Sequence, residues 1–479
     1  MCTRNEVLTS AMKESILLSP EAIEVLESAD IDEIFLQTVL HHLKSQQGLI
    51  SKEDIMSFLS GDKALCKSEK FIPNKVRPNG DIKVLSGTDI TGNSTCTGTI
   101  KDFVGYFKSR YNLLEQVLKE NTECKHHTSI ASAKLRKGDV CLVVMVFDIR
   151  KSKNKGHIII DVEDPSGSCT AFIGKDDPLA SDPIVTDEVL GLAGRFSESG
   201  LFIIRKIIRP SVPKNHKWVD NLSDASIAFI SDVHVGSNEF LKNGWNRMMN
   251  WMKHNAEREE INYLILAGDV VDGIGVYPDQ ELDLNVKDIY KQYEVLSDLL
   301  KDIPDHMQIL MHPGNHDACR LAEPQPALNK MFTETIDSHI NITGNPITVE
   351  VEGRTIVSYH GKSFDDWVGA IPGASYEQPL SMMEHMLDSR HLAPIYGKKN
   401  ALAPEKSDYL AMVHQPDIIV TGHIHNLGAE EYKGVKLINA SAYQAQTSYQ
   451  RQHNFNPVPC ILPVVHLGTG RITLKNFAK

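Results

Sequence analysis

The chain has 479 residues, which is too long for one ordinary domain, so we expect two or three domains. Hydrophobic residues make up 41% and charged residues 23%, fractions typical of a globular protein rather than a disordered or fibrous one. The formal net charge of -12, from 62 acidic and 50 basic side chains, argues against a surface that coats nucleic acid non-specifically. It does not exclude a local basic groove.

The eight cysteines are scattered, and no two have Cys-x-x-Cys spacing, which argues against a zinc ribbon or a redox motif. This usage is typical of a reducing cytosol, so we expect a cytoplasmic protein. The first residues contain no apolar stretch of the kind found in a signal peptide. No run of about 18 apolar residues occurs, so we expect no membrane span and no membrane partner.

Residues 1–60 show apolar positions at helical spacing and two helix-start signals. Ser19 precedes a proline at the first helical position, and residues 51–54 resemble a capping box. We predict a small helical N-terminal domain of about three helices, whose plainest interpretation is a docking module. Residues 61–80, which contain several Gly and Pro, are predicted to be a linker.

Residues 81–215 form the second expected domain, where the apolar period switches toward two. A helix-like insert is expected near residues 113–118. Short strands with tight turns predict a small β-barrel, which we interpret as an OB-fold. The predicted strands are Val140–Phe147, His157–Val162, Cys169–Ile173 and Leu201–Ile208.

One predicted hairpin of this barrel carries a basic tract, composed of Arg150, Lys151, Lys153 and Lys155. Two interpretations stay open. OB-type barrels bind single strands through basic grooves and stacking aromatics. Four cations in a turn are also a common way to keep a hairpin solvated.

Residues 222–479 alternate strand and helix patterns, which predicts an α/β domain. Each of five short apolar strands runs directly into a polar motif. Active sites of α/β layers lie beyond the ends of strands, so we expect all five motifs at one edge of a sheet. The predicted strands are Ile227–Ile230, Tyr263–Ala267, Ile309–Met311, Thr355–Tyr359 and Ile418–Val420.

The five motifs read Ser-Asp-Val-His, Gly-Asp-Val-Val-Asp, Gly-Asn-His-Asp, Tyr-His-Gly and Gly-His-Ile-His. Positions i and i+2 at a strand end point to the same side, so each Asp-x-His or His-x-His pair can reach one ion. Each motif alone is weak and could arise by chance, but order, strand context and ligand type agree. Oxygen and imidazole donors in this order suit a centre of two metal ions. The seven predicted ligands are Asp232, His234, Asp269, Asn315, His360, His423 and His425.

These motifs resemble those of the calcineurin-like metallophosphoesterase superfamily. The resemblance implies a four-layer β-sandwich flanked by helices and two divalent ions, of which Mn²⁺ is expected first and Mg²⁺, Fe²⁺ or Zn²⁺ are alternatives. Asp232, His234, Asp269 and His425 would hold one ion, and Asp269, Asn315, His360 and His423 the other. His316 matches the family histidine that stabilises the developing charge or protonates the leaving oxygen, with Asp317 expected to orient its ring.

Two departures separate this chain from the protein phosphatases of the superfamily. Gly273 stands where those enzymes carry an arginine that clamps the phosphoryl group, and Asp317 stands where they carry glutamate. The motif set is therefore closer to the nuclease branch, which hydrolyses phosphodiesters.

The layout of helical domain, barrel and phosphoesterase domain (222–479) resembles the small subunits of archaeal D-family DNA polymerases. Two stretches carry the resemblance, residues 229–237 (FISDVHVGS) and residues 390–397 (RHLAPIYG). It implies a manganese-dependent, proofreading 3′→5′ exonuclease that acts on single-stranded or mispaired 3′ ends of DNA. The implied partners are a large subunit with the polymerase site and, through the holoenzyme, a sliding clamp.

Two alternatives to a nuclease stay open. The B-subunits of eukaryotic replicative polymerases share this layout, but their ligands are degraded and they act as scaffolds. A non-catalytic scaffold subunit is therefore one alternative, and a phosphomonoesterase is the other. All seven ligands and His316 are present here, which favours catalysis alongside any scaffolding role.

Overall fold

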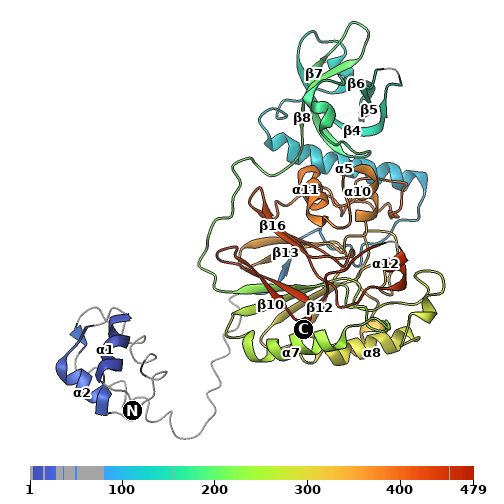
Figure 1. Cartoon of the computed structure of the whole chain (residues 1–479). Helices are drawn as coiled ribbons and strands as arrows, with labels where there is room; N and C mark the ends of the chain where they lie inside the picture. Colours follow the sequence, from blue (N-terminus) through green and yellow to red (C-terminus); the bar gives the residue numbers. More distant parts are fainter. Residues whose placement is uncertain are drawn as a thin grey trace. The chain divides into compact units, whose positions relative to one another are not determined.

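The computed structural model describes residues 4–13, 17–28, 36, 49–50, 55, 80–153, 155–452 and 454–479 (Figure 1). The chain divides into two compact units, residues 1–76 and 77–479, and each is considered by itself. Most of the predicted linker and the capping box predicted at 51–54 lie outside the described residues.

The first unit contains α1 (Arg4–Lys13) and α2 (Pro20–Ser28). The hydroxyl of Ser19 accepts the main-chain N–H of Ala22 at 3.1 Å, so Ser19 caps α2, and Pro20 occupies the first helical position where it loses no hydrogen bond. Two short strands, β1 (Leu17–Leu18) and β2 (Leu49–Ile50), pair in parallel, a feature that the helical spacing does not predict.

The second unit contains a closed five-stranded barrel. Its strands are β4 (Val140–Lys151), β5 (Ile158–Asp164), β6 (Gly167–Ile173), β7 (Val189–Phe196) and β8 (Phe202–Ile208), in the order β4-β5-β6-β8-β7. The apolar pattern does not predict β7, because two glycines interrupt it. At Gly194 a β-carbon would lie 2.1 Å from the carbonyl oxygen of Ile203, so close pairing of β7 with β8 requires glycine there.

The helix expected near residues 113–118 is present, and it precedes the barrel strands. Helix α5 (Ile100–Glu120) starts with a reciprocal capping box between Thr99 and Asp102. Leu114 and Leu118 pack against the outside of β4, while Arg110 on another face points into the C-terminal domain. The short helix α6 (Ile130–Ala133) and the 3-10 turn η1 (Pro178–Ser181) complete this region.

Two six-stranded sheets form the C-terminal domain, in the orders β12-β11-β10-β9-β18-β19 and β16-β17-β15-β14-β13-β3. The first contains β9 (Ser226–Ile230), β10 (Ile261–Ala267), β11 (Gln308–His312), β12 (Ile340–Ile342), β18 (Ile461–His466) and β19 (Ile472–Asn476). The second contains β3 (Lys83–Val84), β13 (Ile347–Val351), β14 (Arg354–Ser358), β15 (Ile418–Thr421), β16 (Gly428–Tyr432) and β17 (Val435–Asn439). Strand β3 pairs with β13, so the start of the segment expected in the barrel domain joins this sheet instead.

The sheets pack face to face and helices cover both outer faces (Figure 1), so the domain is a mixed α/β sandwich of four layers. Apolar side chains such as Phe229 and Ile356 fill the space between the sheets. Helices α7 (Lys242–Asn255) and α8 (Ile289–Leu300) cover the first sheet, and α10 (Phe364–Ala370) and α11 (Pro379–Ser389) cover the second. The short elements are η2 (Gln280–Leu282), α9 (Lys330–Thr333) and α12 (Ser448–Gln452).

All five strands predicted to precede the polar motifs are present. The expectation that the motifs lie at one edge of one sheet is wrong, because β9, β10 and β11 belong to the first sheet and β14 and β15 to the second. The motifs meet because the two sheets are stacked with these strand ends on the same side. In the described part of the chain, no helix has the length and apolarity needed to cross a bilayer.

Candidate metal centre

Five of the seven predicted ligands have a left-handed backbone. Their φ angles lie between 50° and 72°, in a region that residues other than glycine rarely adopt. Such strain persists only where the surrounding structure imposes it, and it clusters at functional sites. The chain therefore turns sharply where β9, β10 and β15 end, which is where these side chains are needed. These residues are Asp232, His234, Asp269, His423 and His425.

Gly422 lets the two sheets approach each other at this point. A β-carbon at Gly422 would lie 1.8 Å from the hydroxyl of Ser231 and 2.5 Å from a carboxylate oxygen of Asp232. The loop after β15 can therefore lie directly on the end of β9 only if position 422 has no side chain. The main-chain N–H of His423 then donates to Asp232 at 2.9 Å.

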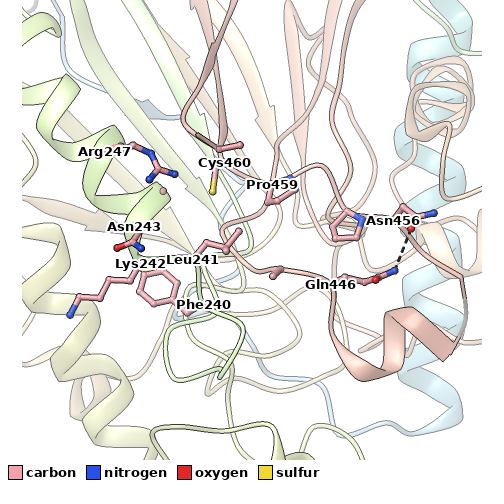
Figure 2. A pocket seen from close by; sticks show the side chains of 13 residues that line it. Phe240, Leu241, Lys242, Asn243, Arg247, Gln446, Asn456, Pro459 and Cys460 are labelled. Atoms are coloured by element: carbon pink, nitrogen blue, oxygen red, sulfur yellow. Dashed lines mark hydrogen bonds between the residues drawn. The ribbon is translucent and has the colours of Figure 1, made fainter.

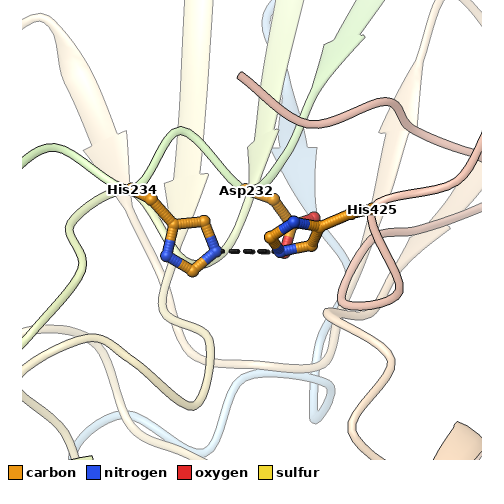
Figure 3. Close-up of side chains that lie close together, drawn as sticks. All are labelled: Asp232, His234 and His425. Atoms are coloured by element: carbon orange, nitrogen blue, oxygen red, sulfur yellow. Dashed lines mark hydrogen bonds and ion pairs between the residues drawn. The ribbon is translucent and has the colours of Figure 1, made fainter. Parts of the chain in front are cut away.

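Asp232, His234 and His425 form the first cluster of candidate ligands (Figure 3). The Nε2 atoms of His234 and His425 are 3.0 Å apart, and Oδ1 of Asp232 lies 3.3 Å from His425 Nε2 and 3.8 Å from His234 Nε2. Two ligands on one ion at about 2.1 Å can be separated by up to roughly 4.2 Å. All three spacings fall within that limit, so these donors fit one cation.

The environment of the Asp232 carboxylate is a further indication of a cation site. It is fully buried, and its Oδ1 has no hydrogen-bond partner among the described residues. Burial opposes a charge on Asp232, yet His425 and His234 hold the pKa of this carboxyl well below its usual range. A buried, ionised oxygen without a partner is costly unless a cation is bound to it.

Asp269, His360 and His423 form the second cluster. Nε2 of His360 lies 3.0 Å from Oδ2 of Asp269 and 3.2 Å from the amide oxygen of Asn315. Burial lowers the pKa of His360, but the charge of Asp269 and its hydrogen bond outweigh burial and raise that pKa to about 9. The oxygen and imidazole donors predicted for a second ion are therefore in contact.

Asp269 lies between the two clusters. Its Oδ2 faces His360 at 3.0 Å in one cluster and His234 at 3.9 Å in the other, while its Oδ1 accepts the main-chain N–H of His316 at 2.8 Å. Burial raises the pKa of Asp269, and the nearby His360 and His316 overcome this and hold it below its usual range. A charged carboxylate in this position can be shared by two cations.

The ring nitrogens that point away from the centre are also fixed. Nδ1 of His234 lies 3.0 Å from Asp272, and Nδ1 of His360 lies 3.0 Å from the carbonyl of Ala267. Nδ1 of His425 lies 2.9 Å from the side-chain amide of Gln450. Such contacts set the orientation of metal-binding imidazoles. Asp272 belongs to the second motif, whereas no local motif marks Gln450.

His316 lies beside the first cluster, with its ring centroid 4.7 Å from that of His234. The expectation that Asp317 orients the His316 ring is wrong, because Nδ1 of His316 bonds to the main-chain oxygen of Asp272 at 2.8 Å. Asp317 instead accepts main-chain N–H groups of Gly314, Val270 and Val271, and it holds the loops together. Burial, and then the charge of Asp269, raise the pKa of Asp317 to about 7.

Two basic residues between the fourth and fifth motifs, Arg390 and His391, are buried. Arg390 is 3% exposed and donates to the carbonyl of Met412, and His391 is 1% exposed and bonds to Asp408. Lys398 and Lys399 of the same stretch are exposed. The stretch 390–397 therefore holds the domain together rather than presenting Arg390 and His391 to a ligand.

A cavity of about 720 Å³ lies between the start of α7 and residues 445–460 (Figure 2). Lys242 and Arg247 line it, but Arg247 is occupied by two hydrogen bonds to the carbonyl of Phe477. Gln446 and Asn456 line the opposite side and are bonded to each other at 3.3 Å. The cavity shares the segment around α12 with the metal centre but none of the predicted ligands.

Comparison with known proteins first indicates a class of polymerase subunits. Residues 227–427, which contain every predicted ligand, match the family model of the B-subunits of DNA polymerases alpha and epsilon. The chain is 40% identical over 406 residues to the DNA polymerase II small subunit of Archaeoglobus fulgidus, covering 83% of this chain and 81% of the relative. It is 35% identical over 485 residues to that of Methanothermobacter thermautotrophicus, covering 98% and 99%. The chain belongs to the family of archaeal DNA polymerase II small subunits, the small subunits of the D-family polymerase.

Solved structures give weaker similarities. An archaeal phosphodiesterase is 13% identical with a TM-score of 0.27 and covers 52% of this chain and 98% of its own. The Vps29 protein of Entamoeba histolytica with Zn²⁺ is 16% identical with a TM-score of 0.25, and the match covers 52% and 89%.

Proposed function

We propose that this protein is the proofreading 3′→5′ exonuclease subunit of a two-subunit, cytoplasmic DNA polymerase. It would hydrolyse phosphodiesters at single-stranded or mispaired 3′ ends of DNA with two divalent ions, Mn²⁺ being the first choice. The observation that carries this proposal is that the seven predicted ligands converge in two neighbouring clusters, with Asp269 3.0 Å from His360 and 3.9 Å from His234, and with His316 alongside. A subunit with a purely structural role has no need of this set.

The domain assignment is part of the proposal. We assign residues 1–60 to a helical domain, 61–80 to a linker, 81–215 to an OB-fold domain, from which β3 extends into the next domain's sheet, and 222–479 to the phosphoesterase domain. The barrel order β4-β5-β6-β8-β7, with β6 and β8 parallel, supports an OB-fold. Such barrels bind single strands, which suits an enzyme that acts on a strand end.

The chain's own residues account for positioning and proton transfer. Two bound cations would supply Lewis-acid activation of the water and of the phosphodiester. Because Nδ1 of His316 is held by the carbonyl of Asp272, Nε2 is the ring nitrogen available to the substrate. Burial lowers the pKa of His316, so a proton on Nε2 is given up readily to a developing negative charge. That proton, taken up from solvent, passes to the 3′ oxygen as its bond to phosphorus breaks, while the attacking water releases its own proton to solvent.

A polarity-resolved nuclease assay tests this function. The full chain, with and without a large subunit, is incubated with a 5′-labelled single strand in Mn²⁺, Mg²⁺ or Zn²⁺. Shortening from the 3′ end is expected in Mn²⁺, and His316→Ala should reduce it at least roughly 100-fold. His254→Ala, which changes an exposed histidine on α7, is the matched control and should keep full activity. Equal rates for wild type and His316→Ala would reject the assignment.

A second role, as a platform for the large subunit, is favoured by one surface feature. The groove between α5 and the barrel, a cavity of about 750 Å³, is lined by exposed apolar side chains such as Ile100, Val104 and Phe147. Exposed apolar patches of this kind mark protein interfaces. Co-purification of Val104→Glu with the large subunit tests this role, and retained binding would exclude the groove.

A further inference from the structure

Two loops that carry aromatic side chains meet beside the second cluster of ligands. One lies between α10 and α11 and carries Tyr376, and the other follows α12 and carries Phe455. Their ring centroids are 4.8 Å apart at an interplanar angle of 65°, an edge-to-face pair. Both side chains are half-buried, so part of each ring faces solvent.

Tyr376 is connected to the second cluster through one carboxylate. Its hydroxyl donates to Oδ1 of Asp365 at 2.8 Å, and Oδ2 of Asp365 lies 3.7 Å from Nε2 of His423. Lys362 donates to the same carboxylate at 2.6 Å. The ring of Tyr376 is therefore fixed at the rim of the metal centre rather than free to swing on its loop.

Phe455 is connected to the first cluster from the other side. Its main-chain N–H donates to the carbonyl of Gln450 at 2.8 Å, and the side chain of Gln450 lies 2.9 Å from Nδ1 of His425. Tyr449, in the same segment, is 54% exposed. Both ends of the aromatic pair are thus held by residues that contact predicted ligands.

We propose that Tyr376 and Phe455 form a stacking wall that receives the unpaired base at the 3′ end of a DNA strand. The inference rests on the proposed exonuclease function and adds what selects its substrate. Aromatic faces stack on any base, which gives affinity without sequence preference. A base inside a duplex is already paired and stacked, so the wall favours single or frayed ends over matched ones.

Binding without hydrolysis provides the first test. Fluorescence anisotropy of the full chain in EDTA compares a short thymidine oligonucleotide with the same strand carrying abasic residues at its last two 3′ positions. Wild type should bind the base-bearing strand roughly tenfold more tightly. Tyr376→Ala should abolish this preference while leaving affinity for the abasic strand unchanged. A preference that survives in Tyr376→Ala overturns the proposal.

Three further variants separate stacking from folding. Tyr376→Phe keeps the ring and loses the bond to Asp365, so it should retain base preference. Phe455→Leu keeps apolar volume without an aromatic face and should lose it, with an unchanged melting temperature. Tyr290→Ala removes another aromatic pair, stacked on Phe332 with centroids 5.2 Å apart, and should behave as wild type. Equal losses on base-bearing and abasic strands would mean that the pair only holds its loops together, which also rejects the wall.

The second test separates this inference from the exonuclease itself. Rates of 3′ hydrolysis in Mn²⁺ are measured on both strands for the same variants. Hydrolysis without any base preference in binding or rate refutes the wall and keeps the exonuclease. Base preference in binding with no hydrolysis by wild type refutes the exonuclease and keeps the wall.

Discussion

The α-carbon of Gly273 lies directly against the main-chain carbonyl of His316. A β-carbon at position 273 would be 2.1 Å from that oxygen, and the φ angle of Gly273 is +74°. The close approach excludes a side chain here, including the arginine of the protein phosphatases, and the positive φ would add strain to any residue other than glycine. The close approach also fixes the main chain of the residue that we place in proton transfer.

Gly273→Ala is expected to reduce exonuclease activity by roughly 100-fold or more, because the added methyl group displaces His316. The measurement is kcat/KM on a labelled single strand in Mn²⁺. Gly275→Ala is the matched control, since Gly275 has a φ of +72° but open space around its α-carbon. If both variants lose activity equally, backbone strain rather than displacement of His316 is responsible.

Removal of divalent metal should destabilise the C-terminal domain. A cation that binds only the folded state stabilises it by about 2.7 kcal/mol at 100 times its Kd, a rise of roughly 5–10 °C in melting temperature. Asp269→Asn should abolish most of this response, because Asp269 faces both His360 of the second cluster and His234 of the first. Asp224→Asn, which changes an exposed residue far in sequence from the predicted ligands His360, His423 and His425, should leave it intact. Calorimetry with Mn²⁺ and with EDTA measures the shift, and an identical response in Asp269→Asn would contradict the shared site.

The buried ion pair between Arg110 of α5 and Asp408 joins the barrel region to the C-terminal domain. Nε of Arg110 lies 2.7 Å from Asp408, and both side chains are fully buried. Asp408→Asn leaves the guanidinium charge buried without a counter-charge. It should lower the free energy of unfolding, measured by urea denaturation, by about 3–5 kcal/mol. Asp302→Asn removes the partner of Lys253 in an exposed pair and should cost about 1 kcal/mol or less. Equal losses of unfolding free energy in the two variants would show that burial does not strengthen the pair of Arg110 and Asp408.

Glu405 stabilises the loop that precedes α5 through hydrogen bonds and an ion pair. Its carboxylate accepts the main-chain N–H of Thr95 at 2.9 Å and the hydroxyl of Ser94 at 2.8 Å, and it pairs with Arg320 at 3.0 Å. Burial alone would raise the pKa of Glu405, but the bonds from Thr95 and Ser94 outweigh it and lower the pKa to about 2. Glu405→Gln should therefore cost about 2 kcal/mol at neutral pH.

The effect of Glu405→Gln should depend on pH. A carboxyl whose pKa is lower in the folded protein stabilises it above the ordinary value of 4.5, and this contribution disappears as the pH falls toward 2. The difference in unfolding free energy between wild type and variant should thus be full at pH 7 and smaller at pH 3. Urea denaturation at both values measures it, and a constant difference would assign the effect to packing alone.

The strands and the motifs that follow them were predictable because both signals are local. An apolar run before Asp232 or Asp269 predicts a buried strand, and the polar residue after it predicts a site at the strand end. The division into two sheets was not predictable in this way. It depends on contacts such as His423 with Asp232, which lie 191 positions apart.

Side-chain roles inside the motifs were harder to predict than the motifs. Asp317 stands next to His316 in sequence, but its carboxylate turns to main-chain N–H groups and the carbonyl of Asp272 holds the ring instead. Gln450 and Asp365 lie outside every motif and reach the centre only through the folded loops. Adjacency in sequence was therefore a poor guide to which group orients which.

The left-handed backbone of the five ligand residues has an evolutionary consequence. Strain of this kind costs about 1–3 kcal/mol per residue, so the centre lowers stability wherever no ion offsets it. Selection purges only losses that matter, so a subunit relieved of chemistry would drift toward residues that relax these turns. A chain in which Asp232, Asp269 and His425 keep this conformation retains a loss of stability that substitutions would readily remove. Retention of this strained geometry should therefore distinguish family members that still use the metal centre from members that serve only in assembly.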